Sequence, residues 1–158
     1  MNSTMILVVV FGIGVVAGLR AMTAPAVVCW AAHLHWINPQ GTPLAFTGTT
    51  IALVIFTLAA IAEIVNDKLP RTGARTALPS VVIRMIMGGF AAATLTLAAG
   101  ASLWIGALLG VVGALAGTFG GYQIRTKAVK ALHSPDFVIA LVEDVVAVCG
   151  GLFLASRL

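Results

Sequence analysis

The chain has 158 residues, of which 60% are hydrophobic and only 9% are charged, and its mean hydropathy is +1.09. Soluble domains carry about 25% charged residues, so this chain has too little polar surface to cover a water-facing globule. The composition therefore excludes a soluble domain. It predicts a single all-α integral membrane domain over residues 1–158, with apolar side chains facing lipid.

The net charge of +4 does not point to nucleic acid. The nine Lys and Arg residues are spread over several short segments and form no continuous basic stripe. The positive-inside rule, by which basic residues gather at the cytoplasmic ends of membrane segments, explains them better. We therefore expect a multi-pass membrane protein without a nucleic-acid partner.

The first apolar segment is Met5–Leu19, which ends at Arg20. It has no basic n-region, and apolar segments continue to the C-terminus, so we expect a retained helix rather than a cleaved signal peptide. The second segment, Ala21–Ile37, reaches about 26 Å as a helix, which is marginal for a hydrocarbon core of about 30 Å. It either spans the membrane or re-enters it, and the side of the N-terminus depends on which of the two holds.

An uncharged, turn-rich loop, Asn38–Pro43, separates the second segment from the third. Its lack of charge and the flanking aromatic residues Trp36 and Phe46 predict a loop on the outer side. The third segment runs from Phe46 to about Val65, and the fourth is Pro79–Ala99.

The fifth segment, Leu103–Gly121, carries one face of glycines at alternating spacings of four and three: Gly106, Gly110, Gly113, Gly117 and Gly120. Small residues let helices approach closely in lipid, where the hydrophobic effect no longer drives helices together. This face predicts tight packing, either inside one protomer or between two copies in a homo-oligomer.

The sixth segment, Pro135–Leu154, completes a set of five or six short, glycine-rich membrane segments. Two basic loops, Lys68–Arg75 and Tyr122–Lys130, lie on the same side if the fourth and fifth segments both span. The positive-inside rule places that side in the cytoplasm.

All five acidic residues lie in or beside two predicted helices, and none lies in a free loop: Glu63, Asp67, Asp136, Glu143 and Asp144. An acid at the centre of a membrane helix costs about 2.5 to 3.5 kcal/mol on insertion scales, so it normally faces a partner or a watery cavity. Glu63 and Asp67 are four residues apart and share one helix face. Glu143 and Asp144 are adjacent and point about 100° apart, so they cannot serve one small site equally.

Arginine side chains are the expected partners of these acids. Arg84, in the first turns of the fourth helix, is the first candidate, because a guanidinium can bind a carboxylate bidentately in a dry interior. Arg20 and Arg125 can do the same from helix ends. The predicted ion- or solute-binding set comprises Glu63, Asp67, Arg84, Glu143, Asp144, Arg20, Lys68 and Arg125.

No catalytic, metal or cofactor site is predicted. His33 and His35 are two residues apart and project to different sides of a helix, which disfavours a shared metal ion. The chain has no G-x-S-x-G serine and no glycine-rich phosphate loop after a strand. We therefore do not expect an enzyme.

Four sequence elements occur together: GLRA from Gly18, EIVNDKLP from Glu63, Arg84 before a glycine pair, and PDFVIALVEDVVA from Pro135. With them the chain resembles, over most of its length, the bacterial membrane-protein family called domain of unknown function 4126. The resemblance implies an inner (plasma) membrane location and a shared set of polar residues, and it assigns no substrate.

The charged residues inside apolar helices leave three functional interpretations. The first is a small transporter or channel-like protein, whose acids bind a cation or proton while arginines balance charge or contact an anionic solute. The second is a structural or partner-binding membrane protein, in which ion pairs only fix helix packing. The third is a lipid-binding or lipid-translocating protein with a lateral opening lined by Arg125, Lys127 and Lys130. The expected partners are membrane lipid, a small ion or solute, and a second copy of the chain.

Overall fold

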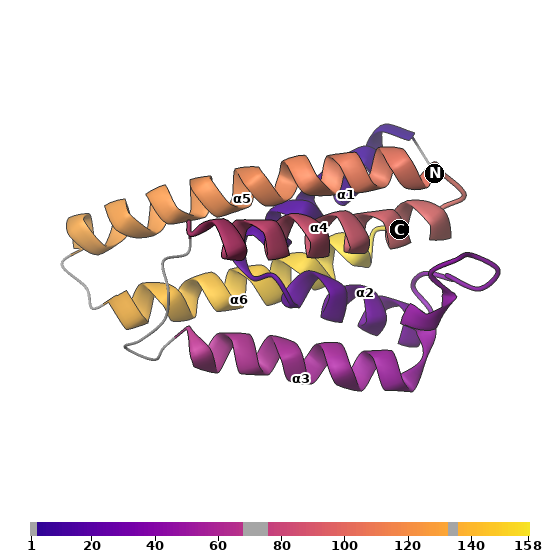
Figure 1. The fold of residues 1–158 in the computed structure, drawn as a ribbon, viewed down its shortest axis with the longest axis horizontal. Coiled ribbons are helices and arrows are strands. Elements are labelled where there is room, and N and C mark those ends of the chain that lie inside the picture. The colour runs from indigo at the N-terminus through magenta and orange to yellow at the C-terminus, as the bar shows by residue number, and fades with distance from the viewer. Residues whose placement is uncertain (1–2, 68–75, 133–135) are drawn as a thin grey trace.

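The computed structural model describes residues 3–67, 76–132 and 136–158 (Figure 1). Over these residues the chain forms six α-helices and one short 3-10 helix, without a strand. The elements are α1 (Ser3–Leu19), α2 (Thr23–His33), η1 (Ala45–Gly48), α3 (Thr50–Asn66), α4 (Leu78–Ala98), α5 (Leu103–Leu132) and α6 (Asp136–Ala155). The predicted all-α fold is confirmed.

Helix length separates the membrane candidates among the described residues. Three helices are long and apolar enough to cross a membrane, and they are Leu78–Ala98, Leu103–Ala131 and Asp136–Ala155. α1 and α3 are apolar helices of 17 residues each, or about 26 Å at a rise of about 1.5 Å per residue. α2 has only 11 residues, about 16 Å, and is too short to cross the hydrocarbon core by itself.

α2 is shorter than the predicted segment Ala21–Ile37 because a Schellman motif ends it. His35 has a positive φ of 60°, and its N–H donates to the carbonyl of Ala32, while the N–H of Trp36 donates to the carbonyl of Ala31. These two bonds satisfy carbonyls at the helix end that otherwise lack donors. The helix therefore stops at His33, about 6 Å short of the predicted end.

α5 is longer than predicted, and the expected basic loop Tyr122–Lys130 is wrong. These residues continue the helix to Leu132. After Gly121 the sequence becomes more polar, but Gln, Arg, Lys, Ala and Leu are all good helix formers. The change of polarity therefore marks a change of surroundings rather than the end of the helix.

Glycines hold α1, α4 and α5 in close contact. A Cβ atom at Gly14 of α1 would collide with the backbone of Gly110, and one at Gly113 of α5 would collide with the α1 backbone. Gly110 likewise lies against the backbone of Gly88 in α4. Backbones approach this closely only when no side chain stands between them. The predicted glycine face thus packs inside the protomer, apart from Gly120, where an added Cβ would meet nothing.

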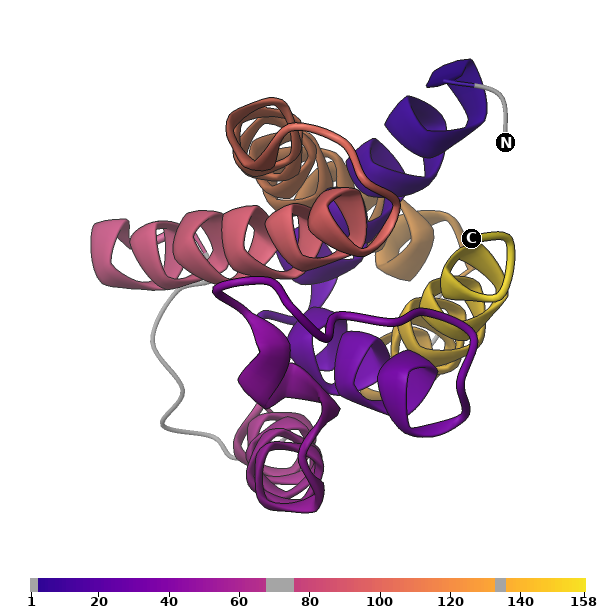
Figure 2. The ribbon, with the colours of Figure 1, turned by 90° about the vertical axis from the view of Figure 1, so that its right-hand side faces the viewer.

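The remaining helices pack differently. α2 contacts both α3 and α6, and α3 lies at the edge of the molecule, where it packs chiefly against α2 (Figure 2). Most α3 side chains are exposed, and only Ala52, Leu53 and Ala60 are buried. We call α1, α4 and α5 the glycine-packed group, and α2, α3 and α6 the peripheral group.

Both chain termini lie at one end of the bundle, together with the α4–α5 turn and the segment that links α2 to α3 (Figure 1). At the opposite end α3 and α5 finish, and α4 and α6 begin. The last turns of α5 carry the exposed residues Lys127 and Lys130 at this second end, which we call the basic end.

Candidate functional site

The turn that joins α1 to α2, residues 20–22, lies inside the bundle. Arg20 contacts Asp144, the ninth residue of α6, and Arg84, the seventh residue of α4, contacts Gly18 just before the turn. At about 1.5 Å per residue, these two positions lie about 12 and 9 Å from the ends of α6 and α4 at the basic end. The chain therefore reverses direction at a level part of the way along α4 and α6, which are both candidate membrane spans.

Arg20 is the largest fully buried side chain that the structure describes, with 1% of its surface exposed. Its Nη2 lies 2.8 Å from Oδ2 of Asp67, just after α3, and its Nε donates to Oδ1 of Asp144 at 2.6 Å. A guanidinium removed from water needs charged partners, because its desolvation costs several kcal/mol. Arg20 thus ties the turn to both α3 and α6.

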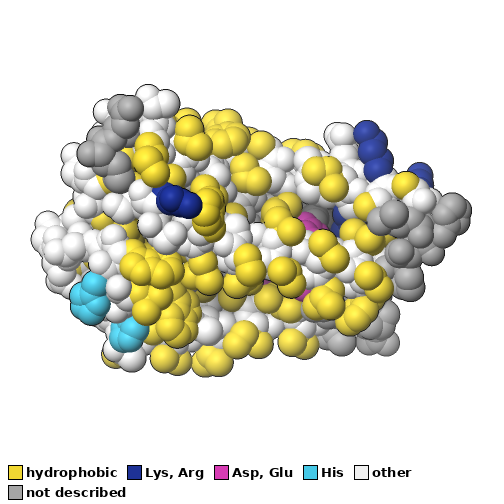
Figure 3. All heavy atoms as spheres, turned by 180° about the vertical axis from the view of Figure 1, so that it is seen from behind, with side chains coloured by type: hydrophobic (Ala, Val, Ile, Leu, Met, Phe, Trp, Pro, Cys, Tyr) yellow, Lys and Arg dark blue, Asp and Glu magenta, His cyan; other side chains and the backbone are white. Residues whose placement is uncertain are grey.

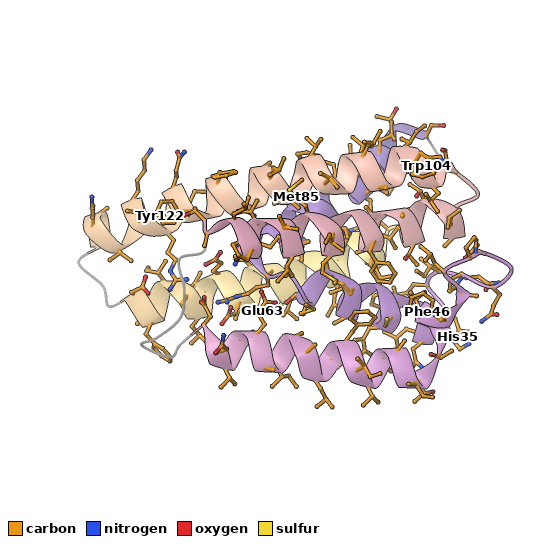
Figure 4. All side chains as sticks on the ribbon, viewed as in Figure 1. His35, Phe46, Glu63, Met85, Trp104 and Tyr122 are labelled. Carbon is orange, nitrogen blue, oxygen red and sulfur yellow. The ribbon has the colours of Figure 1, made fainter. Side chains whose placement is uncertain are left out.

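Glu63 binds the backbone at the start of α2. Its two carboxylate oxygens accept hydrogen bonds from the N–H groups of Ala21 and Met22, each at 2.8 Å. The first N–H groups of a helix have no partner within the helix, and the helix dipole favours a negative charge there. No side chain of α2's own N-cap fills this role. A carboxylate from α3 therefore caps α2, and Figure 4 shows Glu63 between α3 and the rest of the bundle.

Arg84 binds the backbone at the end of α1. Its Nη1 donates to the carbonyl of Gly18 at 2.9 Å. The hydroxyl of Thr118 in α5, which donates to the carbonyl of Ala114 at 2.7 Å, lies 3.3 Å from the Gly18 oxygen. Carbonyls in the last turn of a helix lack partners and attract positive charge. The break between α1 and α2 thus has a cation at the end of one helix and an anion at the start of the next.

Arg125 extends this cluster toward the basic end. It binds Asp136 through two hydrogen bonds, of 2.9 Å from Nε and 2.5 Å from Nη2. Its Nη1 lies 3.3 Å from Oδ2 of Asp67 and 3.7 Å from Oε2 of Glu143. Oδ2 of Asp67 therefore bridges Arg125 and the buried Arg20. The ion pairs form a continuous path from the buried turn to Asp136, whose side chain is 62% exposed.

The carboxyl of Asp67 lies beyond the last residue of α3, and it experiences two opposing effects. Burial would raise its pKa, but the ion pairs with Arg20 and Arg125 outweigh burial and lower the pKa overall. The side chain therefore stays ionised at neutral pH and holds both arginines.

Of the eight predicted site residues, the described part of the chain places seven around the turn or around Arg125. They are Arg20, Glu63, Asp67, Arg84, Arg125, Glu143 and Asp144. Lys68, the eighth, lies outside the described residues. The adjacent acids divide as expected, since Asp144 contacts Arg20 while Glu143 lies near Arg125.

Sequence reasoning missed the backbone half of this site. The carbonyl of Gly18 and the N–H groups of Ala21 and Met22 belong to the backbone, so the residue types in the sequence do not reveal their role. Asp136 was seen as an acid near a helix start but not as a partner of Arg125. The GLRA element was the available clue, because its glycine and arginine stand on either side of Leu19, where α1 ends.

Seen from the face behind Figure 1, acidic side chains show only as small patches within a largely apolar surface, and basic side chains gather mostly at one end (Figure 3). Among the described residues, no group of three or more His, Cys, Asp or Glu side chains is placed to hold a metal ion. The carboxylates contact arginines and backbone N–H groups instead.

The apolar helices and the charged turn inside their bundle define the class: a helical membrane protein with ionic groups between its helices. The chain belongs to the family described as Domain of unknown function (DUF4126), whose model matches residues 7–156. The resemblance expected from the four sequence elements is thereby confirmed. None of the curated proteins and none of the solved structures compared with the chain matches it.

Proposed function

We propose that the protein is a small transporter or channel-like protein of the inner membrane, in which the carboxylate–arginine cluster binds an ion or small solute. The observation that carries this proposal is the start of α2 inside the bundle, where Glu63 binds the N–H groups of Ala21 and Met22, the two residues that precede the helix. Transporters build binding sites from interrupted helices whose ends face a charged group. Irregular backbone at membrane depth is tolerated only where protein buries it or where it lines a cavity.

In the proposed topology, α3, α4, α5 and α6 cross the membrane. α1 and α2 form a hairpin that enters and leaves at the opposite end from the basic end. The shortness of α2 and the position of both termini at one end support this arrangement. The exposed Lys127 and Lys130 put the basic end in the cytoplasm by the positive-inside rule, so both termini face outward.

The cluster offers chemistry for a bound ion. Asp67 is shared between Arg20 and Arg125, so a cation or proton that binds this carboxylate weakens two ion pairs at once. Released arginines then balance charge elsewhere or contact an anionic solute. Such re-pairing links binding to movement of α3 relative to α6, because Arg20 joins these two helices.

The test is thermal unfolding of the purified protein in a non-ionic detergent. The probes are the chlorides of sodium, potassium and magnesium, and the sodium salts of acetate and phosphate, over a range of pH. A probe that binds the folded state raises the midpoint, by an amount equivalent to about 2.7 kcal/mol at 100 times its Kd. We expect a selective rise that disappears in Glu143→Gln and persists in Lys127→Gln, which alters an exposed charge outside the cluster.

Flux of the selected probe into vesicles that contain the protein completes the test. Choline chloride at matched ionic strength is the control for screening by salt. If no probe raises the midpoint beyond that control, the proposal is wrong.

A second function has its own support. Arg20 and Glu63 have ionic and backbone partners within the chain, as expected of charges that only fix helix packing. Replacing a buried ionic group of this kind with apolar residues of similar volume is often neutral or stabilising. If the triple variant Arg20→Met, Asp67→Leu, Asp144→Leu is as stable as the wild type and no probe binds either protein, the structural role holds.

A further inference from the structure

A groove of about 440 Å³ lies between α2, α3 and α6, on the terminal side of the charged turn. It exists because α2 packs against both α3 and α6 and leaves space between them. Its lining is almost entirely apolar and includes Thr23, Val27, Trp30, Thr57, Ile64 and Val148. None of these residues belongs to the carboxylate–arginine cluster, so the inference drawn from the groove does not rest on the proposed function.

Among the described residues, one buried polar group that lines the groove makes no hydrogen bond. Trp30 donates from Nε1 to the hydroxyl of Thr57 at 3.2 Å, so these two polar groups satisfy each other. The hydroxyl of Thr23 is different: the residue is 3% exposed, and its oxygen makes no hydrogen bond. Buried hydroxyls are normally hydrogen-bonded, and an exception calls for a missing partner. An apolar site with one convergent polar group is typical of a ligand pocket.

The surroundings of the groove decide which partner fits. The outer faces of α3 and α6 are aliphatic and exposed: Ile61 lines the groove and is itself exposed, and the exposed Val145 lies three residues before the groove residue Val148. In a membrane protein such faces contact lipid, so hydrocarbon chains have direct access to the groove. Water would find almost no hydrogen-bonding groups there. α2 is about 16 Å long, so an extended hydrocarbon chain can lie along it.

We propose that the groove binds one acyl chain of a membrane phospholipid, with an ester oxygen of that lipid accepting a hydrogen bond from the Thr23 hydroxyl. The chain lies along α2 toward Trp30, and the polar part of the lipid lies at the end of the groove beside the turn. Thr23 directly follows Met22, whose N–H binds Glu63. A bound lipid therefore reaches the immediate neighbourhood of the charged cluster.

Photolabelling of the wild-type protein tests this site. The probe is a phosphatidylglycerol with a diazirine on one acyl chain, in nanodiscs, and labelled peptides are identified by mass spectrometry. We expect labelling of groove residues of α2 and α3 to exceed labelling of the exposed outer face of α5. Equal labelling of all lipid-facing helices would contradict the proposal, because it would indicate general contact with the bilayer.

Matched variants locate the occupant. Ala60→Leu fills the groove from α3, whereas Ala62→Leu makes the same change on the exposed side of that helix. Ala60→Leu should reduce labelling of the groove residues severalfold, and Ala62→Leu should leave that labelling unchanged. Thr23→Val should weaken retention of one lipid, counted by native mass spectrometry, about fivefold, and Thr23→Ser should restore it.

Three results would overturn the proposal. One is labelling unchanged by Ala60→Leu in a protein that still melts cooperatively. Another is equal lipid retention in the Thr23→Val and Thr23→Ser variants. The third is a wild-type dimer that Ala60→Leu dissociates, which would assign the groove to a second copy of the chain. Since the label distribution in the wild type is measured first, a variant that fails to fold does not prevent the test.

Discussion

The helices of the glycine-packed group and those of the peripheral group are held together by different interactions. In α1, α4 and α5, backbones touch where glycines face each other, and an added Cβ would collide with main-chain atoms. In α2, α3 and α6, side chains separate the helices, a groove of about 440 Å³ remains, and ion pairs through Arg20 supply specific links. Close backbone packing is thus confined to one part of the small bundle, whereas the ionic cluster lies where the two groups meet, with Arg84 of α4 and Arg125 of α5 among its members.

The difference in packing affects which helices can move. Close backbone packing resists displacement, because van der Waals contacts are numerous and no side chain can adjust. Ion pairs that share a carboxylate can re-form with another partner, and a loosely packed edge helix can shift. We therefore expect any functional movement in the peripheral group, with the glycine-packed group as its support.

The largest expected effect comes from breaking the ionic link. Arg20→Met leaves the buried carboxylate of Asp144 without its guanidinium, and removal of one partner of a buried pair typically costs 3 to 5 kcal/mol. Lys130→Met, at the exposed end of α5, should change stability by less than about 1 kcal/mol. Thermal unfolding in detergent measures both. Similar midpoints for the two variants would show that the cluster contributes little to holding α3 and α6.

A smaller effect is expected from a single methyl group in the glycine-packed group. In Gly110→Ala the new Cβ meets the backbone of Gly88, and overpacking of this kind costs about 1 to 3 kcal/mol. Gly120→Ala adds the same atom to the same helix where nothing lies within 4 Å. The second change should be neutral or slightly stabilising, because Ala is the better helix former.

The pair of glycine variants separates close packing from helix propensity. Equal unfolding midpoints for Gly110→Ala and Gly120→Ala would mean that α4 and α5 can move apart without loss. In that case the contrast between the two groups would fail, and movement could no longer be assigned to the peripheral helices.

Sequence patterns predicted the helices well, because long apolar runs and a glycine face have few alternatives in lipid. The end of α2 was missed because it depends on the left-handed conformation of His35, a residue without strong preference for a helix stop. The end of α5 was missed because polarity was taken as a sign of a loop, while helix propensity continued to Leu132.

The site residues were predicted from the cost of burying charge, which needs no knowledge of the fold. Their pairing was not predictable in the same way. Which arginine meets which acid depends on the position of the turn at residues 20–22, and that position follows from tertiary packing of Gly18 against α5. The groove was also beyond prediction, since it arises from the spacing of three helices rather than from any one segment.

The smallest expected effect is a pH dependence that belongs to the peripheral group. The pKa of Asp67 is lowered in the folded protein by Arg20 and Arg125, although burial opposes them. A carboxyl whose folded pKa lies below its unfolded value, about 3.9, stabilises the fold above that value, and this contribution is lost as pH falls through the folded pKa. In a non-ionic detergent the wild type should therefore exceed Asp67→Asn in unfolding midpoint at pH 7, and the gap should narrow below about pH 4. A gap that stays constant down to pH 3 would mean that the carboxylate's charge is not what holds the two arginines, and that α3 is linked to the bundle by Glu63 and by packing against α2.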